Sequence, residues 1–135
     1  DDMVGSSDTF VIYSFVGIEG YSKFSNYIGN GAADGPMVHT GFKPAWVMIK
    51  RTTTTNGDWI IYDNTRSPYN EIDDQLVAND ATAETTGSEE VDFLSNGFKI
   101  RTADGGVNAS DGNYIFAAFA EYPFGGDGVT PAPAF

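Results

Sequence analysis

The apolar residues of this chain recur with a period of two, and this period constrains the fold more than any other sequence feature. Residues 9–16, 45–52 and 58–63 are short runs rich in aromatic and β-branched side chains. Successive side chains of a β-strand point to opposite faces, so such runs predict strands. Further strands are predicted over residues 21–28, 36–40, 75–78, 91–94, 98–102 and 114–120.

Turn residues bound these runs. Asn56-Gly57 and Asn96-Gly97 lie between neighbouring runs, and an Asn-Gly pair supplies the positive φ that tight hairpins need. About nine short strands spaced near ten residues apart predict an all-β fold, an antiparallel β-sandwich or jelly roll. No helix is predicted, because residues 80–90 lack an apolar stripe and are interpreted as an exposed loop.

The composition is sufficient for one folded domain and excludes some classes of binding partner. The 135 residues are 41% hydrophobic and 14% aromatic, enough for a core. Asp and Glu number 19 against 7 Lys and Arg, and the resulting net charge of −12 repels the phosphates of nucleic acids and anionic lipids. No apolar run reaches the roughly 18 residues of a membrane span. We therefore expect neither nucleic acid nor membrane as a partner. The absence of cysteine excludes disulfides and thiolate sites.

One strand pattern occurs twice. Residues 4–16 and residues 107–120 each place a Ser-Asp turn before an apolar strand, so that Phe10 aligns with Tyr114 and Phe15 with Phe119. One reading is that residues 1–20 hold a strand that completes a preceding module or a neighbouring chain, followed by a sandwich module over residues 21–124. The other is that two buried strands of one sandwich look alike. Residues 125–135, rich in Gly and Pro, are predicted to be an extended tail.

The chain resembles a repeat of tail-fibre and virion structural proteins of aquatic bacteriophages. The resemblance rests on residues 20–24, 27–31, 33–36, 41–51, 59–63, 93–99, 107–110 and 114–121, and on the Phe-Ala-Glu-Tyr-Pro-Phe sequence of residues 119–124. It implies a lectin-like, concanavalin-like sandwich, a location on the virion, and self-assembly or contact with other virion proteins. It carries no catalytic residues.

Two patterns in the sequence resemble parts of catalytic sites. Glu71-Ile72-Asp73-Asp74-Gln75 resembles the acidic strand of jelly-roll glucanases, but Gln75 stands where the acid/base carboxyl is needed. His39 is the sole histidine, and no nucleophile-elbow motif accompanies it. We predict no enzymatic activity, no catalytic residue and no cofactor.

Binding sites are less constrained. The sequence also allows a site for a structural calcium ion, whose oxygen ligands would come from Asp58, Asp63, Asp73, Asp74 and Asp92. Exposed aromatic rings beside polar loops would suit a host glycan, and Tyr62, Tyr69 and Tyr122 are the candidates, with the loops 52–57, 64–74 and 80–90 around them. Trp59 is a further candidate for stacking on a glycan. Trp46 and Trp59 lie within apolar strands, however, and are predicted to be buried in the core.

The sequence thus favours a structural module of a phage virion, in a tail fibre or another appendage. A host-glycan-binding receptor module and a repeating subunit of an extracellular filament are the alternatives.

Overall fold

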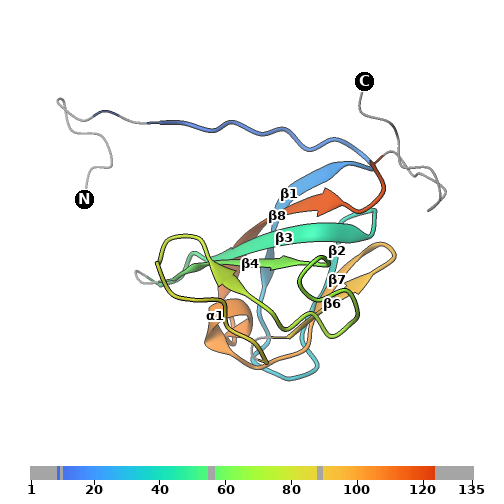
Figure 1. Cartoon of the computed structure of the whole chain (residues 1–135). Coiled ribbons are helices and arrows are strands. Elements are labelled where there is room, and N and C mark those ends of the chain that lie inside the picture. Colours follow the sequence, from blue (N-terminus) through green and yellow to red (C-terminus); the bar gives the residue numbers. More distant parts are fainter. Residues whose placement is uncertain (1–8, 10, 55–56, 88–89, 124–135) are drawn as a thin grey trace.

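The computed structural model describes residues 9, 11–54, 57–87 and 90–123, and it contains two antiparallel β-sheets (Figure 1). The larger sheet has the strand order β1-β8-β3-β4-β5, and the smaller sheet has the order β2-β7-β6. The strands are β1 (Ser22–Ile28), β2 (Met37–His39), β3 (Pro44–Arg51), β4 (Trp59–Asp63), β5 (Leu76–Val77), β6 (Val91–Leu94), β7 (Gly97–Ile100) and β8 (Asn113–Ala120). The prediction of an all-β, antiparallel sandwich is confirmed, and the finer assignment to a jelly roll stays a prediction.

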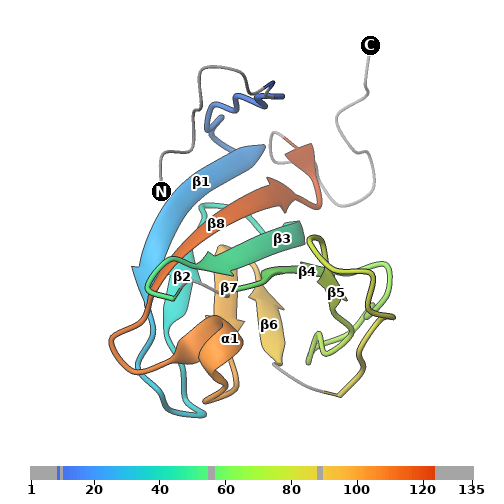
Figure 2. The same ribbon diagram turned by 90° about the vertical axis from the view of Figure 1, so that its left-hand side faces the viewer.

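The two sheets lie face to face (Figure 2). The core is formed by the alternate side chains of each strand that point between them. From the larger sheet, Val47, Ile49, Tyr62, Tyr114 and Ala118 are fully buried. The smaller sheet contributes Val91, Phe98 and Ile100. The rings of Phe98 on β7 and Phe116 on β8 meet edge to face, with centroids 5.2 Å apart, so they join the two layers directly.

The hairpin between β6 and β7 contains Gly97, but this glycine is not required for the predicted positive φ. The paired residues Leu94 and Gly97 flank a two-residue loop of Ser95 and Asn96, and Gly97 does not have a positive φ. Glycine is needed there because an added Cβ would lie 2.1 Å from the carbonyl oxygen of Val38 on the neighbouring strand. Residue 56 of the other predicted Asn-Gly turn lies outside the described residues.

One short helix was not predicted. The helix α1 (Gly105–Asn108) begins after Asp104, whose carboxylate accepts a hydrogen bond from the Gly106 amide at 2.7 Å. This N-cap and the buried Val107 stabilise a single turn that is too short to show a helical period. Asn108, which begins the sequence Asn-Ala-Ser, is fully buried at the end of this turn.

The predicted strand over residues 9–16 pairs with no other strand within the described residues, and its pairing with a preceding module or a neighbouring chain stays a prediction. Residues 11–17, called the arm below, are extended but unpaired, and they leave the body at the start of β1 (Figure 1). A bridge between Ile18 and Ser22 fixes the root of the arm. The helices of the described residues include none that could span a membrane. The predicted tail, residues 125–135, lies outside the described residues.

Candidate functional site

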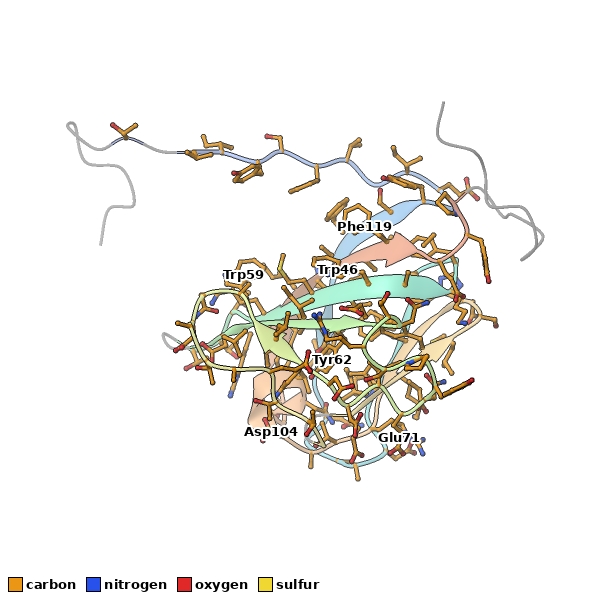
Figure 3. All side chains as sticks on the ribbon, in the orientation of Figure 1. Trp46, Trp59, Tyr62, Glu71, Asp104 and Phe119 are labelled. Atoms are coloured by element: carbon orange, nitrogen blue, oxygen red, sulfur yellow. The ribbon has the colours of Figure 1, made fainter. Side chains whose placement is uncertain are left out.

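The side of the larger sheet that faces away from the core is apolar. Strand register places residues of β1, β8, β3 and β4 side by side on it, and we call this surface the outer face. Its members are Phe24, Trp46, Met48, Trp59, Ile115, Ala117 and Phe119. Figure 3 shows Trp46, Trp59 and Phe119 on the side of the sheet toward the arm. An uncovered sheet face of this composition is characteristic of a contact surface.

Aromatic contacts order the outer face. The Phe119 ring meets the Phe24 ring edge to face with centroids 5.9 Å apart, and it lies 5.6 Å from the Trp46 ring. At the far end of the face, the Lys50 ammonium lies 5.4 Å from the centre of the Trp59 ring. Because these side chains are half-buried against one another, the surface is preorganised before anything docks on it.

The arm runs past this face and covers it only in part. The Phe15 ring stacks on the Phe24 ring, with centroids 5.3 Å apart and planes at 23°. Tyr13 and Phe15 line a groove of about 430 Å³ together with the outer face. Five large apolar side chains of the arm, those of residues 11–13, 15 and 16, nevertheless keep 67–82% of their surface exposed. The arm is therefore much more exposed than the outer face, whose side chains are half-buried apart from Ile115, which is 40% exposed.

The smaller sheet presents a different outer surface. Lys99 on β7 forms ion pairs and hydrogen bonds outward, contacting the Asp34 carboxylate at 2.6 Å, and Asp92 on β6 lies 3.4 Å from Arg101. The hydrogen bond and charge of Lys99 hold the pKa of the Asp34 carboxyl below its ordinary value of 3.8. This charged surface is ordinary for a sheet that faces water, so the apolar character belongs to the larger sheet.

The structure separates the predicted glycan-contact residues. Tyr62 is fully buried in the core and its hydroxyl donates to the Gln75 side chain at 3.4 Å, so the prediction of Tyr62 as an accessible platform is wrong. Tyr69 is 83% exposed, and Tyr122 is exposed at the end of β8. Tyr69 lies on the loop between β4 and β5, whereas Tyr122 follows β8, so the two exposed tyrosines belong to different segments.

The prediction for the two tryptophans is also wrong. Trp46 and Trp59 are half-buried on the outer face and take no part in the core. A signal for this was present in the sequence, because residues 45–49, 59–62 and 114–120 are almost continuously apolar. Continuously apolar strands contact apolar groups on both faces. A strand with one solvent-exposed face instead alternates apolar and polar residues.

The structure places the residues of the acidic pattern as follows. Glu71 is exposed (Figure 3). Gln75 is buried, and Asp74 accepts a hydrogen bond from the Ser67 hydroxyl at 2.8 Å. His39, the other residue considered for catalysis, is exposed on β2.

The candidate calcium ligands are dispersed as well. Asp63 pairs with Arg66 and accepts hydrogen bonds from the amides of residues 65 and 66. Asp58 accepts from the Asn79 amide group at 3.0 Å. Within the described part of the chain, no three His, Asp or Glu side chains are grouped as metal ligands.

Comparison with known proteins gives one match. A family model described as a domain of unknown function (DUF7483) matches residues 2–123, which include both the arm and the two sheets. No curated protein matches the chain, and no solved structure matches it.

Proposed function

The chain belongs to the DUF7483 family, a domain of unknown function, and on this premise we propose that it is a non-enzymatic structural module of a phage virion. The observation that carries the proposal is the pairing of an exposed apolar arm with an uncovered apolar sheet face in one chain. Both are surfaces for association, because apolar area exposed on this scale is stabilised when another molecule covers it.

The placement on a virion, in a tail fibre or another appendage, rests on the sequence resemblance to tail-fibre and virion repeats. The fold agrees with that role, since a rigid sandwich can repeat along an appendage and join its neighbours through sheet faces and strands. Other copies of the chain and other virion proteins are the proposed partners.

Host-glycan recognition is the second candidate, and Tyr69 is the observation that favours it. This ring is 83% exposed on the loop between β4 and β5, in the kind of position where an aromatic ring stacks on a sugar. The groove beside the arm suits a glycan less well, because its lining is almost wholly apolar and sugar hydroxyls require polar partners. A filament subunit is a third candidate and would use the same arm and face.

Mass spectrometry of purified particles tests the virion assignment. The phage that encodes the chain should carry it in gradient-purified particles at a fixed ratio to the other structural proteins, and antibody labelling in the electron microscope should place it on an appendage. A chain that is abundant in infected cells but absent from washed particles would overturn the proposal.

A glycan array with the full chain tests the second candidate. Binding that is lost in Tyr69→Ala and retained in Tyr122→Ala would support recognition through the loop that carries Tyr69. No binding at millimolar sugar would remove the glycan role from this module and leave the structural role in place.

A further inference from the structure

We propose that the outer face is covered by a second copy of this chain, with the two arms lying between two outer faces related by a two-fold axis. This inference deepens the proposed function by naming the partner and the mode of contact, and it concerns the isolated chain as well as any particle.

The first argument is that the arm is apolar on both sides. Tyr13 and Phe15 line the groove on the outer face of their own chain. The alternate residues Ile12 and Val16 do not line it, and they are 82% and 72% exposed. A strand that is apolar on both sides belongs between two apolar layers. One layer is the outer face of the same chain, and an identical face of a second copy supplies the other.

The second argument comes from the backbone of the arm. Residues 11–15 form no backbone hydrogen bond within the described part of the chain. Burying an extended segment without partners for its amides is costly. An antiparallel arm from a second copy would provide those partners, and antiparallel pairing of identical strands is what a two-fold axis produces.

The third argument is charge. Residues 9–18 carry no charged side chain, and the residues lining the groove carry none either. The whole chain has a net charge of −12, so two copies repel one another across most of their surfaces. The arm and the groove form an apolar region without acidic side chains where two such acidic molecules can meet, and the nearby Lys50 over Trp59 adds one positive charge at its far end. A cationic partner would find no carboxylate on the groove lining to bind.

The fourth argument is that the root of the arm is fixed. Ile18 and Ser22 exchange two backbone hydrogen bonds at 3.0 and 2.8 Å, and the Ser22 hydroxyl donates to the Val16 carbonyl at 3.2 Å. The arm is thus presented beside its own outer face at a set position, which lowers the entropy lost when two copies associate.

Sedimentation velocity of the full chain tests the proposal over about 1–100 μM, a range that brackets micromolar affinity. We expect a concentration-dependent monomer–dimer equilibrium. Ile12→Glu and Val16→Glu should each raise the dissociation constant about tenfold or more, because they place a charge on the side of the arm that meets the second copy. Both residues are highly exposed in the single chain, so thermal unfolding of the diluted variants should be unchanged.

Tyr69→Glu is the matched control, because Tyr69 is equally exposed but lies on a different loop. It should leave the dimer intact. A chain that stays monomeric throughout the range would overturn the inference. So would a dimer that Ile12→Glu and Val16→Glu do not weaken, because two copies would then be meeting through another surface.

Cross-linking locates the contact, since the chain has no cysteine of its own. One population carries Ser14→Cys, on the same side of the arm as Ile12 and Val16. A mass-tagged population carries Asn26→Cys, because Asn26 is exposed and is paired with Ile115 of the outer face. A short bis-maleimide should join the two populations. A dimer that gives no mixed product would refute the placement of the arms.

The two proposals fail separately. A chain that dimerises through its arms but is absent from purified particles would overturn the virion role alone. A chain that is present in particles but monomeric in solution, with arm variants that incorporate normally, would overturn the face-to-face contact alone.

Discussion

Asn30 and Asn108 are joined by two hydrogen bonds across 78 residues of sequence. The Asn108 amide group donates to the Asn30 side-chain oxygen at 3.0 Å, and the Asn30 backbone amide donates to the Asn108 side-chain oxygen at 2.8 Å. The same Asn108 nitrogen also lies 2.8 and 2.7 Å from the carbonyl oxygens of Ala32 and Thr102, so its two hydrogens are shared among three acceptors. One fully buried side chain therefore ties the loop after β1 to the end of α1.

Replacing Asn108 by alanine should lower the free energy of unfolding by about 2–4 kcal/mol, because several buried donors and acceptors lose their partner together. Urea denaturation followed by circular dichroism measures this loss. Asn26→Ala, at an exposed position of β1, should change stability by less than about 0.5 kcal/mol. Equal effects of the two substitutions would show that the Asn108 hydrogen bonds add little to stability.

Gly97→Ala should destabilise the chain by about 2 kcal/mol or more, since its Cβ would meet the Val38 carbonyl oxygen and force β2 and β7 apart. Thermal unfolding reports the effect. Gly17→Ala provides the comparison, because the nearest atom to its Cβ lies at 3.6 Å. A Gly97→Ala variant as stable as Gly17→Ala would contradict the close approach of these strands.

The ion pair of Asp34 and Lys99 should make stability depend on pH in acid. The pKa of the Asp34 carboxyl is lowered in the folded chain, chiefly by the hydrogen bond from Lys99. The ion pair therefore contributes fully to folding stability above the ordinary pKa of 3.8. This contribution is lost as the pH falls through the lower pKa that Asp34 has in the folded chain. The stability difference between the parent chain and Asp34→Asn should be small at pH 6 and should vanish in strong acid.

Urea denaturation at several pH values measures that difference. Asp73→Asn serves as the control, because Asp73 forms no ion pair in the described structure. A difference that grows on acidification would contradict the assigned sign. Since the Asp34 side chain is largely exposed, added salt should weaken the effect at every pH.

Salt should strengthen the association of two copies. The proposed contact is apolar and has no acidic side chain, while the two chains each carry a net charge of −12, so screening removes repulsion and leaves the attraction intact. Sedimentation at 50 and 500 mM sodium chloride should show the dissociation constant falling with salt. A dissociation constant that rises with salt would indicate that opposite charges hold the copies together.

Local composition predicts most of the secondary structure of this chain. Short runs of β-branched and aromatic residues between turn residues could form little other than strands, so β3, β4 and β8 could be placed closely from their composition. The single turn of α1 could not, because four residues held by the Asp104 cap and by packing of Val107 carry no periodic signal.

The side of each strand that faces the core depends on how the two sheets pack. Trp46 and Val47 are adjacent and both apolar, and no local rule says which of them turns inward. Val47 is buried because the smaller sheet packs on its side of β3, whereas Trp46 faces the arm. The unpaired state of residues 11–17 has the same origin. Strand propensity is local, but pairing requires the segment to lie along a sheet edge. The arm leaves the body at the start of β1 instead of folding back along the edge of that strand.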